Sequence, residues 1–516
     1  MPKWFNIAGP CKSDIHYMLS PLARLPELTK LIDQQGYFVI HAPRQVGKTT
    51  AMLSLAQELT ASGQYTAIMV SAEVGATFPH DPGTAEAAML DNWRNAAKFR
   101  LPPDLQPPVW PEAGAGQRIG TALSEWAQQS LRPLVVFIDE IDSLQDETLI
   151  AVLRQLRSGY PNRPVGFPHA LALIGVRDVR DYRYASGGSD RLNTSSPFNI
   201  KIKSLTLRNF TAAEVAQLYE QHTAATGQRF EPEAVQHAFT LTQGQPWLVN
   251  ALAKEIVEEL LPDTAQPVTV EHFETAKEVL IQRQDTHIDS LVSVLRNGRV
   301  RAIIEPILAG QELGDIPHDD RQFLIDLGLV VRSSSGGLVI ANPIYREVLP
   351  RVLASGPQDS LPMIHPSWLT SAGLLDPDKL LQAFLGFWRQ HGQPLLKSAP
   401  YHEIAPHLVL MAFLHRVVNG GGTLEREYAI GSDRMDLCLR YGAVTLGMEL
   451  KVWRAGRPDP LAAGLQQLDR YLAGLGLKTG WLIIFDRRPN LPQIAERTTT
   501  EKAATPSDRA ITVIRG

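Results

Sequence analysis

The stretch His-Ala-Pro-Arg-Gln-Val-Gly-Lys-Thr-Thr, residues 41–50, decides the fold of this chain. It directly follows the apolar run 37–40, which predicts a strand, and it leads into a helical pattern. A strand, a tight loop and a helix form the context in which the motif G-x-x-x-x-G-K-[ST] binds phosphate. The tail Gly47-Lys48-Thr49 matches that motif, whereas Ala42 stands at the position of its first glycine.

This loop can supply the groups that a nucleotide phosphate needs. Successive backbone N–H groups can point at an anion, and the following helix adds the positive end of its dipole. Lys48 would reach the β- and γ-phosphates, and the Thr49 hydroxyl would hold Mg²⁺. The residues expected around the nucleotide are Arg44, Gln45, Val46, Gly47, Lys48, Thr49 and Thr50. The alternative is an ordinary loop that carries Gly-Lys-Thr by chance.

A second apolar run, residues 134–138, predicts a buried parallel strand that ends at Asp139 and Glu140. Acids at the end of such a strand suit phosphate chemistry. Asp139 would hold the Mg²⁺ shell, and Glu140 would polarise the attacking water. The alternative is a helix N-terminus, where acidic residues are favourable in the first turn. Both motifs in this chain order favour a site for ATP and Mg²⁺.

The composition is that of a globular chain with several domains. Its 516 residues are 44% hydrophobic and 20% charged, and its net charge of −4 excludes a globally basic nucleic-acid binder. No run approaches the ~18 apolar residues of a membrane span, and the N-terminus lacks the apolar segment of a signal peptide. Cys11 and Cys438 are too few and too far apart for a disulfide framework or a zinc site, which favours the cytoplasm.

Strands alternate with helices up to residue 205, which predicts an α/β fold with a parallel sheet. Further strands are expected at residues 67–70, 170–176 and 198–202. Ligands of such sheets bind at the carboxyl ends of the strands. Arg177 would close the third core strand there and could report the γ-phosphate, although it could equally be a solvated arginine at a strand end.

Three further segments are expected along the chain. Residues 206–286 are predicted to form a helical lid, and residues 287–356 three short helices and a β-hairpin, which is typical of a winged helix. The third of those helices, 319–326, holds more acids than bases, which favours packing or oligomerisation over reading a DNA groove. Proline-rich residues 354–366 predict a linker, so residues 357–516 would form a C-terminal α/β domain.

The C-terminal part contains a second group of residues with chemical potential. Residues 435–440 and 444–451 have the pattern of a β-hairpin. Alternate residues of a strand share a face, so Glu449 and Lys451 would point the same way, with Asp436 on the partner strand. Two carboxylates can hold Mg²⁺ and activate water, and Lys451 would stabilise the developing charge. The alternative is a surface strand with an exposed acid–base pair.

Residues 1–350 resemble bacterial AAA-like ATPases of the STAND and origin-recognition type. The resemblance is carried by the segments FNIAGPCKSDIHYML, APRQVGKTT, LVVFIDEID, LIGVRDVRDY, SPFNI and TQGQPWLVNALA. It implies that Arg177 is a sensor arginine and that Pro246, in Gly244-Gln245-Pro246, lies against the nucleotide base. It also implies a switch that holds ADP at rest and assembles with ATP, with a winged helix after the lid.

Residues 401–488 resemble the PD-(D/E)xK nuclease-like superfamily. Asp436, Glu449 and Lys451 match the core of its motif, and Gln466 matches a glutamine on the following helix. Glu403 and Glu427 are candidates for an additional acid. The resemblance implies a restriction-endonuclease-like fold. Some members of the superfamily have lost activity, whereas the residues of this motif are intact here, which indicates that the domain is competent to cut DNA. By analogy, the fusion of an AAA-like ATPase to a nuclease-like domain suggests a role in defence against foreign DNA.

The sequence therefore predicts an ATP-binding and ATP-hydrolysing switch that controls a Mg²⁺-dependent DNA nuclease. Its expected partners are DNA, copies of itself in an ATP-dependent homo-oligomer, and a protein trigger, with no membrane. Two other functions fit the residues. One is a signalling or scaffold ATPase whose tail only binds DNA or a partner, and the other is a motor ATPase that remodels DNA with the tail as a clamp.

Overall fold

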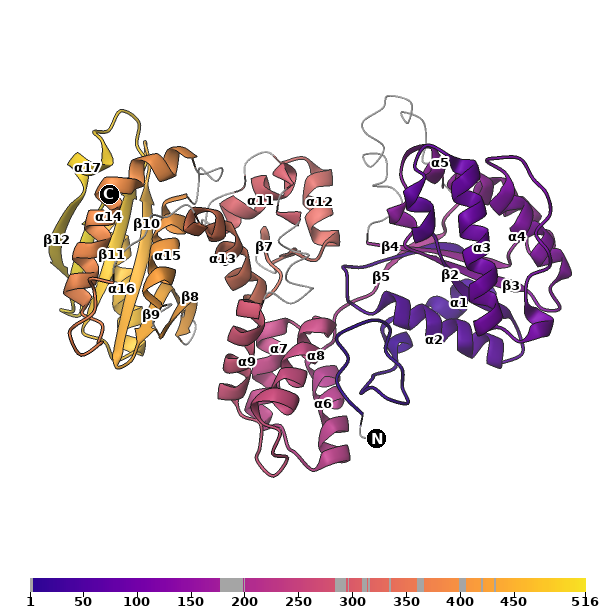
Figure 1. Cartoon of the computed structure of the whole chain (residues 1–516), viewed down its shortest axis with the longest axis horizontal. Helices are drawn as coiled ribbons and strands as arrows, with labels where there is room; N and C mark the ends of the chain where they lie inside the picture. The colour runs from indigo at the N-terminus through magenta and orange to yellow at the C-terminus, as the bar shows by residue number, and fades with distance from the viewer. Residues whose placement is uncertain are drawn as a thin grey trace. The chain divides into compact units, whose positions relative to one another are not determined.

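The structure is a computed structural model that describes residues 3–176, 198, 200–283, 294–295, 297–308, 313, 316–333, 336–359, 366–398, 405–418, 421–430 and 433–516. The chain divides into two compact units (Figure 1). The first unit contains Met1–His287 and Ile316–Pro343, and the second contains Ile288–Asp315 and Ile344–Gly516.

A parallel five-stranded sheet in the order β2-β3-β4-β1-β5 forms the centre of the first unit. Its strands are β1 Tyr37–His41, β2 Thr66–Ser71, β3 Leu134–Asp139, β4 Ala170–Gly175 and β5 Lys203–Thr206. Strands β3 and β4 are buried along their whole length, as continuous apolar runs between two helical layers should be. The carboxyl ends of β1, β3 and β4 meet at one edge, which confirms the parallel α/β sheet predicted from the sequence.

Helices cover both faces of this sheet (Figure 1). On one face, α1 Leu28–Asp33 and α2 Lys48–Ala61 share a core with the β1 and β3 side chains Phe38 and Phe137. On the other face, α3 Pro82–Arg100, α4 Arg118–Gln129 and α5 Asp146–Gly159 bury Trp93 and Trp126 against the strands. Four short helical turns belong to this layer: η2 Glu73–Thr77, η3 Pro103–Leu105, η4 Ile141–Ser143 and η5 Tyr160–Asn162. A fifth turn, η1 Pro21–Arg24, packs against α2 on the other face.

The fifth strand lies further along the chain than the sequence predicts. The apolar pattern at 198–202 predicts a strand there, but the strand that pairs with β1 is Lys203–Thr206. Phe198 is instead buried in the core beside the α3–α5 layer. Because β5 is an edge strand in which only Leu205 is buried, its sequence lacks the apolar run that marks a central strand. The prediction of a strand at 198–202 was therefore wrong.

A helical lid follows the sheet in the first unit. It consists of α6 Ala212–Thr226, α7 Pro232–Thr242, α8 Pro246–Glu255, η8 Ile256–Leu260 and α9 Val270–Arg283. A capping box starts α6, in which the Thr211 hydroxyl accepts from Glu214 N and the Glu214 carboxylate accepts from Thr211 N. The N-terminal segment packs on these helices, with Phe5 fully buried against Tyr17 and Tyr219.

After the lid, the described elements are α11 Gly298–Leu308, α12 His318–Asp326, β6 Val330–Arg332, β7 Leu338–Ile340 and α13 Pro343–Asp359. The antiparallel pairing of β6 with β7 confirms the predicted hairpin. Helix α13 continues into the segment 354–366, where the sequence predicts a linker. Residues 360–365 of that segment lie outside the described residues.

The C-terminal part of the second unit is a mixed six-stranded sheet in the order β12-β13-β11-β10-β9-β8. Its strands are β8 Gly422–Ile430, β9 Asp433–Tyr441, β10 Val444–Trp453, β11 Thr479–Asp486, β12 Thr499–Ala504 and β13 Ala510–Arg515. Its helices are α14 Pro377–Ser398, α15 Ala405–Val418, α16 Leu461–Gly474 and α17 Ile494–Arg497. The antiparallel pairing of β9 with β10 confirms the hairpin predicted there.

Helix α16 packs on one face of this sheet, where Leu468, Leu472 and Leu482 share a core with Cys438. Glu449 and Lys451 of β10 lie on this face, because alternate residues of a strand point the same way and Leu482 is the register partner of Glu449. Among the described residues, none of the helices combines the length and the apolar character needed to cross a membrane.

Candidate functional site

The loop after β1 has the backbone that a phosphate-binding loop needs. Gly47 has a φ of 96°, a left-handed conformation in which glycine is unstrained, and it directly precedes α2. A Cβ at this position would lie 3.1 Å from Nη2 of Arg24, so the loop also has little room for a side chain. Ala42 is fully buried in the core beneath the loop, so its methyl group points away from the phosphate side. This explains why alanine can replace the first glycine of the motif.

Lys48 and Thr49 connect the loop to the end of β3. The Thr49 hydroxyl donates to Oδ2 of Asp139 at 2.8 Å. Nζ of Lys48 donates to the carbonyl oxygens of Ala42 at 2.8 Å and Pro43 at 2.9 Å. Burial lowers the pKa of Lys48, and the nearby acids Asp139, Asp142 and Glu140 oppose that shift. The two sequence motifs therefore meet in one polar cluster.

The two acids at the end of β3 differ in their surroundings. Asp139 is buried, with 3% exposure, and burial raises its pKa while the Thr49 hydrogen bond lowers it. Glu140 has a φ of 55° and lines the adjacent cavity. Burial, together with the charges of Asp139 and Asp142, raises the pKa of Glu140. Asp139 is thus placed for a metal shell shared with Thr49, and Glu140 for contact with a molecule in the cavity.

A cavity of about 610 Å³ lies between the loop, the lid and the N-terminal segment of the first unit. We call residues 4–19 the strap. Cys11 N donates to the Thr50 hydroxyl at 3.1 Å, and the Trp247 indole donates to Ile7 O at 2.9 Å. Gln221 of α6 binds the backbone N and O of Met18 at 3.0 Å each. The strap therefore joins the phosphate loop to two lid helices.

The end of the cavity nearest the lid has polar atoms that no described residue satisfies. Tyr17 and Asn250 line the cavity and are 2% and 7% exposed, yet the Tyr17 hydroxyl and Asn250 Oδ1 have no partner there. Asn250 Nδ2 donates to Pro246 O at 2.8 Å, which leaves Oδ1 as the available acceptor. These two buried polar atoms are available to hydrogen-bond a polar molecule in the cavity.

The remaining residues that the sequence predicts around the nucleotide differ in their burial. Val46 is buried, Gln45 is exposed with a φ of 59°, and Arg44 is exposed. Pro246 lines the cavity at the start of α8. Arg44, Gln45, Val46, Gly47, Lys48, Thr49, Thr50 and Pro246 all line the cavity. Arg177, the proposed sensor, lies outside the described residues.

Arg24 is a cavity residue to which the sequence assigns no role. Its Nη1 donates to Val46 O in the phosphate loop and to Arg208 O before the lid, both at 3.0 Å. The guanidinium lies 4.9 Å from the centre of the Phe210 ring, and burial lowers its pKa to about 10. A single arginine in a short helical turn has no recognisable sequence pattern, so only the three-dimensional arrangement identifies it as a link between loop and lid.

The second unit brings the predicted nuclease-like residues together. Asp436 Oδ2 accepts from the backbone N of Leu450 at 2.7 Å, which places it beside Glu449. Lys451 Nζ donates to Glu449 Oε1 at 2.6 Å and to Gln467 Oε1 at 2.8 Å. Gln467 Nε2 in turn donates to the hydroxyl of Tyr471 at 2.5 Å. We call Asp436, Glu449, Lys451 and Gln467 the carboxylate–lysine cluster.

Glu449 is the electrostatic centre of this cluster. It is fully buried, and its Oε2 has no hydrogen-bond partner among the described residues. Burial and the nearby charge of Asp436 raise the pKa of Glu449 to about 8, and Lys451 opposes the shift. A buried carboxylate oxygen without a donor beside a second carboxylate fits a divalent cation, which prefers oxygen ligands.

The cluster differs from the sequence prediction in two respects. The glutamine that contacts Lys451 is Gln467, whereas Gln466 is exposed, so the assignment of Gln466 was wrong. The proposed additional acids cannot be assessed, since Glu403 and the side chain of Glu427 lie outside the described residues. Among the residues that are described, no three His, Cys, Asp or Glu side chains converge on one point.

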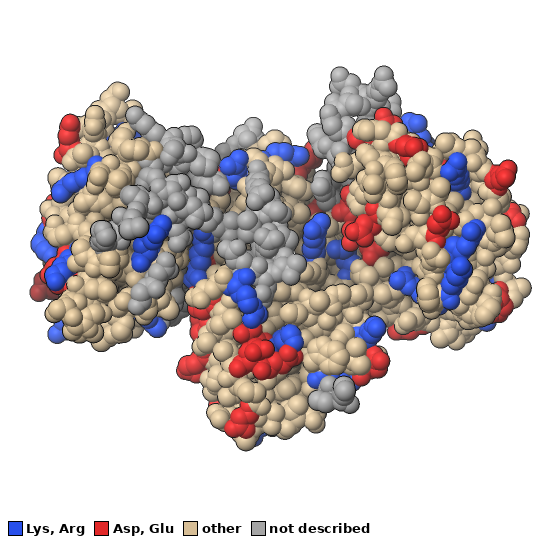
Figure 2. Space-filling model, viewed as in Figure 1, with Lys and Arg blue, Asp and Glu red and all other residues tan. Residues whose placement is uncertain are grey.

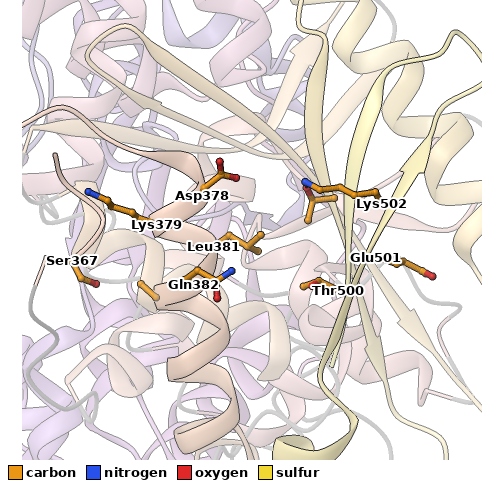
Figure 3. Close-up of a pocket in the computed structure, with 10 residues that line it drawn as sticks. Ser367, Asp378, Lys379, Leu381, Gln382, Thr500, Glu501 and Lys502 are labelled. Atoms are coloured by element: carbon orange, nitrogen blue, oxygen red, sulfur yellow. The ribbon is translucent and has the colours of Figure 1, made fainter.

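A second cavity, of about 750 Å³, lies between α14 and the strands β12 and β13 (Figure 3). Asp378, Lys379 and Lys502 line it, whereas the Glu501 side chain points away from it and pairs with Arg515. Thr512 also lines it, and this residue points away from the α16 face on which Ile511 and Val513 are buried. The cavity is therefore on the other side of the sheet from the carboxylate–lysine cluster.

Comparisons with known proteins cover mainly the first part of the chain. A family model for an AAA-like domain matches residues 22–346. No protein with a curated description matches the chain. A solved Walker-type ATPase of Pyrococcus abyssi is similar at 13% identity and a TM-score of 0.48, covering 67% of this chain and 99% of that chain.

Two other solved structures are similar over comparable lengths. The RuvB Holliday junction branch migration motor of Thermotoga maritima has 15% identity and a TM-score of 0.33, covering 62% of this chain and 89% of that chain. Cdc6p from Pyrobaculum aerophilum has 10% identity and a TM-score of 0.35, covering 77% of this chain and 93% of that chain.

Proposed function

Because the chain belongs to the AAA-like domain family, we propose that it is an ATP-driven switch that controls a Mg²⁺-dependent DNA nuclease. The observation that carries the first half is the hydrogen bond of Thr49 to Asp139, with Lys48 beside them. These residues have the positions needed to hold Mg²⁺ and the β- and γ-phosphates of ATP. When bound, Mg²⁺ would neutralise charge on those phosphates.

Within this proposal, the residues around the cavity have separate tasks. Lys48 and the backbone N–H groups of the loop bind phosphate, and Asp139 and Thr49 hold the metal shell. Glu140 orients the attacking water and accepts its proton. Asn250 and Tyr17 bind the base, and Pro246 packs against it. Arg177 is proposed to sense the γ-phosphate.

The carboxylate–lysine cluster supports the second half of the proposal. Asp436 and Glu449 would hold Mg²⁺, which would polarise a phosphodiester and activate water. Lys451, held between Glu449 and Gln467, would stabilise negative charge on the phosphate. The unpartnered Oε2 of Glu449 is the single observation that favours a metal over a purely structural ion pair.

Nucleotide state would control nuclease access through assembly. We propose an ATP-dependent homo-oligomer that forms in the cytoplasm in response to a protein trigger and acts on foreign DNA. In this scheme residues 1–205 form the ATPase core, 206–286 the lid, 287–356 a winged helix and 357–516 the nuclease domain. The winged helix would serve packing between copies.

A signalling or scaffold ATPase without nuclease activity is the second candidate. The complete burial of Glu449 and its ion pair with Lys451 favour this alternative, because both features also suit a structural role. In that case the C-terminal domain would only bind DNA or a protein partner.

One experiment separates the two candidates. Purified full-length protein is incubated with supercoiled plasmid and with single- and double-stranded oligonucleotides, with and without ATP and Mg²⁺. We expect cut products that require Mg²⁺ and increase with ATP. Binding of DNA without cleavage under every condition would favour the scaffold ATPase, and equal cleavage by Asp436→Ala would assign the activity to a contaminant.

A further inference from the structure

Arg24 lies at the junction of the phosphate loop and the lid, and its side chain lines the nucleotide cavity. We propose that Arg24 is a positioning residue that makes closure of the lid depend on a phosphate in the loop. The negative charge of the phosphate would stabilise the bridge that this arginine forms between loop and lid. The inference rests on the proposed ATP-binding function, for which it names the regulation.

One nitrogen of the Arg24 guanidinium contacts both sides of the junction. Nη1 donates to Val46 O in the loop and to Arg208 O before α6, at 3.0 Å each. Nη2 lies beside Gly47, since a Cβ built on that glycine would be 3.1 Å away from it. Because one side chain binds both carbonyls, a shift of the loop changes the position of the chain that enters the lid.

On the lid side, the contacts of Arg24 extend to the start of α8. The guanidinium lies 4.9 Å from the centre of the Phe210 ring, and Phe210 N donates to Gly244 O at 2.8 Å. A Cβ on Gly244 would lie 1.9 Å from Phe210 O, so these two backbones are in tight contact. Gln245, the N-cap of α8, and Pro246, which lines the cavity, come next in the chain. Arg24 is therefore connected to the lid wall of the cavity by packed groups.

The positive charge of Arg24 has no carboxylate in contact with it. Its side chain is 8% exposed, and it forms no ion pair with any acid in the described part of the chain. Burial lowers the pKa of Arg24 to about 10, so the group remains a cation at neutral pH, and the charge of Glu214 opposes the shift. Glu214 is itself engaged by Arg208, at 2.6 and 2.9 Å. A buried cation without an acid in contact is unfavourable, and an anion in the cavity would relieve that penalty.

The lid brings no charge of its own to the cavity. Among the described residues that line the cavity, those from the lid are Phe210, Leu218, Pro246, Trp247 and Asn250. The segment 206–283 contains 11 acids against five lysines and arginines, and Figure 2 shows acidic side chains gathered on the visible face of the lid. Four of those five cations pair with acids of the lid. Arg24 therefore provides, from outside the lid, the cation through which the lid can respond to phosphate.

Exchange of backbone amide hydrogens tests this coupling, with pyrophosphate and Mg²⁺ as the probe. Pyrophosphate has the phosphates of a nucleotide but no base that could hold the lid by other contacts. In the wild type, saturating pyrophosphate should slow exchange in the loop and also at the amides of Phe210 and Gln245, which donate within the lid. Arg24→Met keeps an apolar stem but removes the charge and the donors. In this variant pyrophosphate should slow exchange in the loop only.

Calorimetry with ATP measures the same coupling as an affinity. Arg24→Met should bind ATP about ten-fold more weakly, because coupling between two sites typically changes affinity by about 5–150-fold. Arg24→Lys keeps the charge on a compact ammonium group in place of the planar fork and should restore part of the lid response. Arg229→Met, which removes an exposed arginine of the lid, is the matched control and should behave as the wild type does.

The melting temperature without ligand reports that each variant is folded. If Arg24→Met does not fold, Arg24→Lys replaces it and must show a weaker lid response than the wild type. A lid response equal to that of the wild type would overturn the proposal. Loss of protection in the loop as well would also overturn it, by making Arg24 a phosphate ligand. A wild type that binds neither ATP nor pyrophosphate would instead refute the proposed ATP-binding function and the inference with it.

Discussion

Lys48 combines two roles at the scale of the single residue. Its ammonium group donates to two loop carbonyls, and the charges of three nearby acids act on it. A phosphate that enters the loop would attract Lys48 away from those carbonyls and towards its own oxygens. The ammonium group can therefore exchange its two carbonyl partners for a bound anion, whereas its apolar stem stays packed in the half-buried loop.

We predict that Lys48→Ala abolishes ATP binding with little change in melting temperature, because the lysine makes no large contribution to the apolar core. Isothermal titration calorimetry with ATP and Mg²⁺ measures the loss. Lys98→Ala, which removes an exposed lysine of α3, is the matched control and should bind ATP normally. Equal ATP affinity of wild type and Lys48→Ala would refute the assignment of the loop.

Glu140→Gln should keep ATP bound and slow its hydrolysis by about 10²–10⁴-fold, because the amide preserves shape but cannot accept the proton of water. Phosphate release under saturating ATP measures turnover, and calorimetry measures binding. Glu112→Gln makes the same change in an exposed loop and should leave turnover unaffected. Normal turnover by Glu140→Gln would exclude this residue as the catalytic base.

Single residues also show the limits of prediction from sequence. The pairing of Thr49 with Asp139 was predictable, because both residues belong to local motifs whose strand and loop contexts are readable. Gln467 was missed in favour of its neighbour Gln466, although a signal existed. Gln467 is one helical turn from Gly464 and Tyr471, which are buried, whereas Gln466 is on the solvent side of α16.

At the scale of the element, the start of α6 is the most strongly capped helix end near the cavity. Arg208 forms a two-pronged ion pair with Glu214, at 2.6 and 2.9 Å, and this pair lowers the pKa of Glu214 to about 2. Arg208 also provides the carbonyl that Arg24 binds. The cap therefore holds the chain at the point where sheet and lid join.

We predict that Glu214→Gln lowers the melting temperature at pH 7 by about 2–4 °C, as expected for the loss of about 1 kcal/mol of helix capping. The pKa of Glu214 is about 2 in the folded state, below its usual value of 4.5. Between these two pH values the folded state therefore binds fewer protons than the unfolded state. The stabilisation is complete above pH 4.5 and is lost as the pH falls towards 2.

Scanning fluorimetry of the wild type and Glu214→Gln between pH 7 and pH 3 tests this pH dependence. The difference between wild type and Glu214→Gln should narrow as the pH falls, whereas Glu220→Gln, an exposed glutamate on the same helix, should show little difference at any pH. If the difference in melting temperature widens at low pH, the ion pair does not stabilise the folded state.

The elements also differ in how readable they are from sequence. Strands β1, β3 and β4 are continuous apolar runs between two helical layers, so their positions follow from composition alone. In strand β5 only Leu205 is buried, and the sequence predicts this strand too early in the chain. Its position depends on pairing with β1 at the sheet edge, which is a contact between distant residues that local patterns do not contain.

At the scale of the whole molecule, the two chemical sites lie in separate units of the chain. We predict that Asp436→Ala removes nearly all DNA cleavage, by about a thousand-fold, and that adding Lys451→Ala removes little more, because residues of one catalytic unit act non-additively. Neither change should weaken ATP binding. Ca²⁺ should replace Mg²⁺ in DNA binding but poorly in cleavage, since it accepts looser geometry.

Nicking of supercoiled plasmid measures this prediction. Asp378→Ala, which removes an exposed acid on α14, is the control for charge loss in the same domain and should cut normally. Additive losses from Asp436→Ala and Lys451→Ala would mean that the two residues act in separate sites. A loss of ATP binding in either variant would contradict the independence of the two units.

The contacts of the strap can form only late in the synthesis of the protein. Its residues Ile7 and Met18 bind partners 240 and 203 positions later in the chain, at Trp247 and Gln221. At 5–20 residues per second, a ribosome needs roughly 10–50 s to make that distance. During this interval Phe5 has no lid to bury it and the nucleotide cavity lacks one wall. A nascent chain therefore cannot enclose ATP in this cavity until its lid has been translated.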